Sequence, residues 1–118
     1  MAPTVQPALR GRLIWTLTAD GVLGLILRMR RTLGFPSLPR LGLRLFLPES
    51  MNRVDYHGLG PFESYADKYR ASHHGTFSAD VADLHEDYIR PQENGSHADC
   101  DEVTVSGGGL LRDRKSVV

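Results

Sequence analysis

The chain has 118 residues, of which 41% are hydrophobic and 24% are charged, and its formal net charge at pH 7 is zero. This length allows one globular domain at most and excludes a multidomain enzyme. The single cysteine, Cys100, excludes an internal disulfide and a metal cluster held by several thiolates.

The charges are distributed unevenly. Residues 1–48 contain seven arginines and one acid, Asp20, whereas residues 78–102 contain eight acids and one base, Arg90. We interpret this as two differently solvated faces rather than as a field that steers a charged ligand. Because the basic residues are spread out and are not interleaved with aromatic side chains, we expect no nucleic-acid partner.

The first half predicts a hairpin. Leu13–Thr18 is rich in β-formers, residues 19–21 form a turn signal around Asp20-Gly21, and the apolar run resumes at Val22–Met29. The whole apolar stretch Leu13–Met29 is interrupted by Asp20-Gly21 and is shorter than the ~20 residues of a membrane span, which argues against a transmembrane or signal segment. Two prolines within Gly34–Arg40 then predict an extended connector.

Short strands are predicted further along. Leucines alternate with other residues over Leu41–Leu47, the period of a strand with one buried face, and Val54–His57 reads as another strand. Gly58–Pro61 is expected to break that strand into a loop, and Phe62–Ala71 to form a short helical turn. We expect a turn at His73–Gly75.

The C-terminal half predicts a polar loop at Gln92–His97 and a final strand around Glu102–Val105. Short strands, the absence of a convincing long helix and twelve glycines favour an all-β fold, an antiparallel β-sandwich.

The last residues have a different character. Residues 113–118, DRKSVV, are what the codons GAT CGG AAG AGC GTC GTG of a widely used sequencing-library adapter encode. We therefore expect a poorly defined segment at residues 1–10, a partial sandwich domain at 11–111 and a non-native tail at 112–118. Resequencing the genomic locus would check this origin.

Three motifs in order carry a family resemblance. They are LPRLGL at residues 38–43, YHGLGPFESYADK at 56–68 and YIRPQENG at 88–95. Their type and spacing resemble the small-chain domain at the C-terminal end of bacterial β-galactosidases of glycoside hydrolase family 2. The resemblance covers roughly residues 11–111.

The resemblance implies part of a sandwich related to galactose mutarotases. Because such sandwiches run to about 200–250 residues, this chain would be around half of one. It further implies a parent enzyme that hydrolyses terminal β-D-galactosides such as lactose with retention, with catalytic glutamates in a separate barrel domain. That barrel would be the partner of this piece, a divalent metal such as Mg²⁺ would bind in the other domains, and the parent would be a cytoplasmic homo-oligomer.

No residue of this chain is assigned as catalytic. A retaining glycosidase needs two carboxyl groups about 5–5.5 Å apart, which makes Glu63 and Glu93 a tempting pair. We expect instead that each accepts hydrogen bonds from backbone amides of its own loop, so this piece alone should be inactive.

Ten residues are candidates for a substrate pocket or for loops with a purely structural role. Tyr65 and Asp67 either shape the wall of a galactose site or an interdomain contact, or fill the sandwich end and cap a turn. The QENG residues suit sugar hydroxyls and suit a self-bonded turn equally well. The full set is Gly60, Pro61, Glu63, Tyr65, Asp67, Pro91, Gln92, Glu93, Asn94 and Gly95.

No metal ligand or cofactor is assigned to this piece. His73 and His74 are adjacent and cannot easily bind one ion tetrahedrally, and no HExxH spacing exists around His85. Many relatives carry an arginine and an Arg-Trp pair where this chain has His97 and Asp101-Glu102, which makes a charge-dependent role of that loop doubtful. The alternative functions are a carbohydrate-binding module and a mutarotase-like epimerase.

Overall fold

The computed structural model describes residues 9–31, 41–90 and 92–114. Within them the chain forms six β-strands, two short 3₁₀ helices and no α-helix, and every strand pairing is antiparallel. The predicted all-β antiparallel class is confirmed. The chain divides into two compact units, residues 1–44 and 45–118, and each is described by itself.

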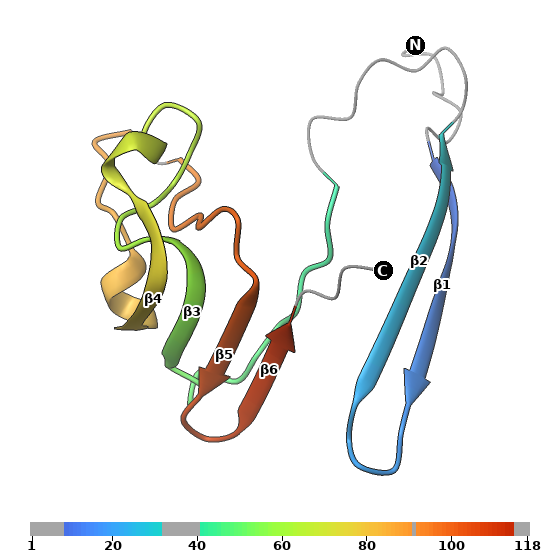
Figure 1. Ribbon diagram of the computed structural model, residues 1–118. Coiled ribbons are helices and arrows are strands. Elements are labelled where there is room, and N and C mark those ends of the chain that lie inside the picture. Colours follow the sequence, from blue (N-terminus) through green and yellow to red (C-terminus); the bar gives the residue numbers. More distant parts are fainter. Residues whose placement is uncertain (1–8, 32–40, 91, 115–118) are drawn as a thin grey trace. The chain divides into compact units, whose positions relative to one another are not determined.

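The first unit is the predicted hairpin (Figure 1). Strand β1 (Leu9–Leu17) pairs with β2 (Leu23–Arg31), so both strands are longer than the sequence predicted. The turn between them closes with backbone hydrogen bonds between Thr18 and both Gly21 and Val22. Gly21 has a φ of 85°, a left-handed conformation that glycine adopts without steric cost.

The hairpin has two chemically different faces, because alternate residues of a strand point to opposite sides. On one face the pairs Leu13–Leu27, Trp15–Leu25 and Leu17–Leu23 lie side by side. On the other face Arg10 lies opposite Arg30 and Arg12 lies opposite Arg28. The apolar face is open to solvent within this unit; Trp15, for example, is 50% exposed.

The second unit is a four-stranded sheet in the order β4-β3-β5-β6 (Figure 1). The strands are β3 (Arg53–Gly60), β4 (His73–Asp80), β5 (Glu102–Ser106) and β6 (Leu110–Arg114). The long connection between β4 and β5 contains the QENG motif, residues 92–95. Strand β3 is central, so its residues are held from both sides.

An aromatic group at one end of β3 forms the core of this unit. The Tyr56 side chain is only 5% exposed, and its ring packs against Phe77 and His97 at centroid distances of 5.4 and 4.5 Å. Gly60 makes room for this group, because a Cβ there would lie 2.7 Å from the Phe77 ring and closer still to the Tyr56 hydroxyl.

Three local predictions are wrong. Residues 41–47 form no strand, and Phe46 is 86% exposed. A strand needs a neighbouring strand for its backbone hydrogen bonds, and the alternation of leucines does not provide one. Strand β3 continues through Gly58 and Leu59 to Gly60, and β4 already begins at His73, since these two segments pair with each other.

The expected helical turn at 62–71 is reduced to one 3₁₀ turn, Tyr69–Ala71, and a second 3₁₀ turn, Val81–Leu84, follows β4. The strand around 102–105 and the polar loop at 92–97 are confirmed. The expected proline-containing connector, residues 34–40, lies outside the described residues.

The expected segment boundaries differ from the observed elements at both ends. Strand β1 begins at Leu9, inside the segment expected to be poorly defined, and β6 extends through Arg112 to Arg114, into the expected non-native tail. The origin of residues 112–118 stays a prediction. Among the residues that the structure describes, no helix is long and apolar enough to cross a membrane.

Candidate functional site

Two loops near the end of β3 bring together two of the three sequence motifs, those at residues 56–68 and 88–95. The ExYxD loop (residues 61–72) follows β3, and the QENG loop (residues 85–98) precedes β5. Glu63 and Ser64 of the first loop are buried, although both are polar. Buried polar groups need hydrogen-bond partners, and the second loop supplies them.

The Glu63 carboxylate lies between these loops. Its Oε1 accepts a hydrogen bond from Lys68 Nζ at 2.7 Å, and its Oε2 accepts one from the Gly95 backbone N–H at 2.8 Å. The hydrogen bond from Lys68 is the largest cause that holds the pKa of Glu63 below its usual value, with a further contribution from Gly95. The group is therefore a carboxylate, held at both oxygens.

Lys68 connects Glu63 to the start of the QENG loop. Its ammonium lies 4.2 Å from the centroid of the Tyr88 ring and also contacts the Tyr88 hydroxyl. A cation over an aromatic face is attracted by the ring quadrupole. Glu63, Lys68 and Tyr88 thus form one connected polar group.

A second set of hydrogen bonds runs beside this group. The Ser64 N–H donates to the Ser96 carbonyl at 2.8 Å, and the Ala98 N–H donates to Ser64 Oγ at 2.5 Å. The Leu59 N–H donates to the Ala98 carbonyl at 3.0 Å, which continues the pairing toward β3. The two loops are therefore joined by these backbone contacts as well as by the hydrogen bond from Gly95 to Glu63 and the contacts of Lys68 with Tyr88.

Two of the predicted site residues in the QENG loop, Asn94 and Gly95, are hydrogen-bonded to their surroundings. Asn94 Nδ2 donates to the Glu86 carbonyl at 2.9 Å, and Gly95 has a left-handed φ of 73°. Gln92 lines a small hollow together with Asn94 and His85. These contacts favour the structural interpretation of the loop for Asn94 and Gly95, whereas the role of Glu93 stays a prediction.

The expected hydrogen bonding of Glu63 is present, but its amide partner lies in the other loop. Gly60 is the last residue of β3 and Pro61 is the first residue of the ExYxD loop. The Pro61 carbonyl accepts a hydrogen bond from the Tyr56 hydroxyl at 3.4 Å. The Tyr65 carbonyl accepts from the Lys68 N–H at 2.8 Å, which turns the chain back toward Glu63.

Exposed Asp67 lines a hollow formed by the ExYxD loop and Glu86, so both interpretations of Asp67 stay predictions. Pro91 lies outside the described residues.

Sequence reasoning missed Lys68, Ser64 and Ser96. A lysine five residues after a glutamate was a usable signal for Lys68, because a single turn can bring the two together. Nothing in the sequence indicated that Ser64 would pair with Ser96. As a chemical group, the cluster is suited to holding loops: a general acid of a glycosidase has a raised pKa, whereas that of Glu63 is lowered.

The comparisons with known proteins agree with the motifs. The family model for the β-galactosidase small chain matches residues 1–113. A β-galactosidase of Staphylococcus xylosus is 41% identical over 104 residues, which cover 88% of this chain and 10% of that protein. Those of Actinobacillus pleuropneumoniae and Vibrio cholerae are 37% and 38% identical over 78% and 83% of this chain.

The chain spans about 10% of the length of each of these curated relatives. No solved structure matches it. The match to the family model covers nearly the whole sequence, including both loops that Glu63 joins. The chain therefore belongs to the β-galactosidase small-chain family.

Proposed function

We propose that this chain is a non-catalytic part of a β-galactosidase and that it holds two loops at the edge of the enzyme's substrate pocket. The observation that carries the proposal is the family match over residues 1–113. The geometry supports it, because Glu63 accepts a hydrogen bond from Gly95 of the QENG loop and its partner Lys68 contacts Tyr88 of the same loop, so the ExYxD loop is held against the QENG loop.

The parent enzyme would hydrolyse terminal β-D-galactosides such as lactose. Its two reacting glutamates would lie in a barrel domain and would act by the retaining double displacement that the resemblance implies. A divalent metal such as Mg²⁺ would bind in those other domains, and the parent would form a homo-oligomer. These features rest on the family resemblance alone.

The hairpin supports the existence of a protein partner. Trp15, Leu17 and Leu23 are 50–73% exposed on one face, and burying such side chains stabilises an interface by about 25 cal/mol per Å². Contiguous apolar patches of this kind mark interaction surfaces. We assign the catalytic barrel of the same parent chain as the partner.

Activity measurements on a chimera test this proposal. The matching segment of the S. xylosus enzyme is replaced by this chain, and hydrolysis of o-nitrophenyl galactoside is compared with that of a deletion variant and of the 118-residue chain alone. We expect activity only in the chimera. Hydrolysis by the isolated chain, or full activity of the deletion variant, would refute the scaffold role.

Two matched variants test the partner surface. Trp15→Lys in the chimera places a charge on the apolar face and should lower the yield of assembled, active enzyme. Arg12→Lys, on the opposite face of the same strand, should leave it unchanged. Equal effects of the two changes would contradict docking through the apolar face, and saturable millimolar galactose binding by the isolated chain would favour a carbohydrate-binding module instead.

A further inference from the structure

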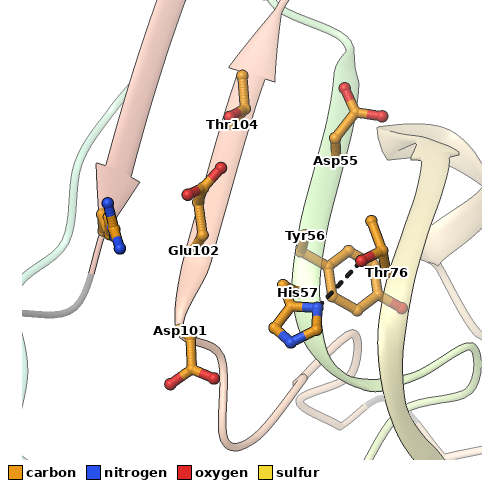
Figure 2. Close-up of a pocket in the computed structure, with 8 residues that line it drawn as sticks. Asp55, Tyr56, His57, Thr76, Asp101, Glu102 and Thr104 are labelled. Carbon is orange, nitrogen blue, oxygen red and sulfur yellow. Dashed lines mark hydrogen bonds between the residues drawn. The ribbon is translucent and has the colours of Figure 1, made fainter.

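A cluster of two histidines and an aspartate lies on the sheet of the second unit, close to where the two loops join its strands. His57 is on β3, His74 is on β4, and Asp101 is where the chain enters β5. One nitrogen of each ring and one carboxylate oxygen lie within 4.8 Å of one another, and all three residues are exposed. Figure 2 shows His57 and Asp101 at the same end of the sheet, beside Glu102.

The sheet register produces this arrangement. His57 pairs with Thr76 across β3 and β4, so His74, two residues away on β4, is its diagonal neighbour on the same face. The two rings meet edge to face with centroids 4.6 Å apart. Asp101 is brought alongside because its N–H donates to the His57 carbonyl at 2.9 Å.

The contact of His57 with Thr76 prepares one ring nitrogen for a metal. Nδ1 of His57 lies 3.0 Å from Thr76 Oγ1, as the dashed line in Figure 2 shows. If Nδ1 carries the proton and donates to this hydroxyl, Nε2 has a free lone pair. Metal-binding histidines are commonly held in this way by a hydrogen bond from the other ring nitrogen.

The spacing of His74 and Asp101 matches two ligands of one ion. His74 Nε2 lies 3.5 Å from Asp101 Oδ2 and 3.3 Å from the Asp99 carbonyl. Two ligand atoms that are each about 2.0–2.1 Å from a tetrahedral zinc lie about 3.4 Å apart. A metal ion can therefore take the place of the proton between this nitrogen and this carboxylate, and a nitrogen of the His57 ring lies within 4.8 Å of both as the third ligand.

Acids outnumber bases in the hollow beside the cluster, where Asp55, Asp101 and Glu102 lie with Arg114. Glu102 follows Asp101 directly and pairs with His57 in the β3–β5 register, although its carboxylate is engaged by Arg112 at 2.7 Å. Asp99 adds a third acid within four residues of sequence. Concentrated negative charge raises the local concentration of divalent ions.

We infer that His57, His74 and Asp101 bind a zinc-class transition-metal ion, with the remaining position open to water. Two imidazoles and one carboxylate suit zinc and its neighbours in the first transition row and do not suit Mg²⁺ or Ca²⁺, which prefer oxygen ligands. The inference is independent of the proposed scaffold role, because it requires no galactoside and no other domain.

Titration of the untagged, chelator-treated 118-residue chain with Zn²⁺ tests the site by calorimetry. We expect saturable binding of one ion, which His57→Gln, His74→Gln or Asp101→Asn each removes. Thr76→Val should lower the affinity by roughly 10–100-fold, because it removes only the group that orients His57. Mg²⁺ should produce no saturable heat.

His85→Gln is the matched control. His85 also faces a carboxylate, Asp87, at 3.3 Å, but it belongs to no group of three possible ligands among the described residues. Its loss should leave zinc affinity unchanged. Unchanged binding in His74→Gln, or equal losses in His85→Gln and His74→Gln, would overturn the inference.

Histidine ring resonances provide a test that needs no variant. Zinc should shift the ring signals of His57 and His74 and leave those of His73 and His85 in place. Shifts spread evenly over all histidines, or equal zinc binding in concentrated urea, would show binding without a folded site and would also overturn the inference. A chain that remains unfolded when saturated with zinc would likewise overturn the inference, because the ligands are brought together only by the folded sheet.

Discussion

Replacement of Glu63 by glutamine tests whether its carboxylate holds the two loops together, directly through Gly95 and indirectly through Lys68, which contacts Tyr88. Glutamine has the same shape but is neutral, and it offers one acceptor oxygen where the carboxylate offers two. If that oxygen keeps the hydrogen bond from Gly95, the amide NH₂ group faces the Lys68 ammonium, which is a donor opposite a donor. Lys68 must then turn toward solvent.

The magnitude follows from the contacts. A hydrogen bond to a charged group contributes about 1.5–3 kcal/mol. The Lys68 side chain is 38% exposed, so the ion-pair part is screened and contributes less than about 1 kcal/mol. We expect Glu63→Gln to lower the free energy of unfolding by about 1–2 kcal/mol, or roughly tenfold in the unfolding equilibrium constant.

Urea unfolding followed by circular dichroism measures this change. Glu49→Gln is the control, because Glu49 is exposed and its substitution should alter stability by less than about 0.5 kcal/mol. Lys68→Met should cost at least as much as Glu63→Gln, since it leaves the buried carboxylate without its cation. The double variant should cost less than the sum of the two. Equal effects of Glu63→Gln and Glu49→Gln would refute the reasoning.

The same pair predicts a pH dependence. The folded-state pKa of Glu63 lies below the usual value of about 4.5, so its carboxylate stabilises the fold fully above that pH and loses this contribution as the pH falls through the folded-state pKa. The stability difference between wild type and Glu63→Gln should be constant above about pH 5 and shrink below pH 4.5. A difference that stays constant down to acid unfolding would exclude ionisation as its cause.

Three further changes have expected outcomes. Gly58→Ala should destabilise the sheet by about 1–3 kcal/mol in urea unfolding, because a Cβ there would lie 2.9 Å from Cys100 Cα, whereas Gly42→Ala meets nothing within 4 Å and should not; equal costs would contradict this. Arg28→Glu replaces a like charge opposite Arg12 with an opposite charge and should stabilise the hairpin by about 0.2–1 kcal/mol, measured as slower amide exchange. High salt should remove this stabilisation, and exchange that is unchanged at low salt would argue against repulsion between the two arginines. The isolated chain should self-associate in sedimentation through its exposed strand edges and apolar face, and a monomer that melts cooperatively would contradict that expectation.

The parts of the fold that were predicted correctly depend on short-range chemistry. Asp20-Gly21 between two runs of β-formers fixes a hairpin, because only that turn allows the flanking residues to pair. The same reasoning failed at residues 41–47, where the side chains alternate but no described strand lies alongside. It also failed at His73–Gly75, whose turn-forming composition is overridden by pairing with Gly58–Gly60.

The candidate site could be located from sequence but not assembled. The ESYAD and QENG motifs identified the loops, yet the contact between Glu63 and Gly95 joins residues 32 positions apart. Which amide reaches the carboxylate depends on how β3 and β5 bring the loop ends together. Sequence composition therefore predicted polar, bonded loops and could not name the partners.

His97 and Asp101, where the resemblance implies a departure from many relatives, contact nearby residues in the structure. His97 packs on Tyr56 and its Nδ1 lies 3.1 Å from the Leu59 carbonyl, so it contributes to the core that supports the QENG loop. Asp101, where the resemblance implies the arginine of an Arg-Trp pair in many relatives, faces His74. An arginine at that position would repel a cation, whereas aspartate completes the cluster with His57 and His74. The departure that the resemblance implies at Asp101 therefore coincides with one of the three proposed metal ligands.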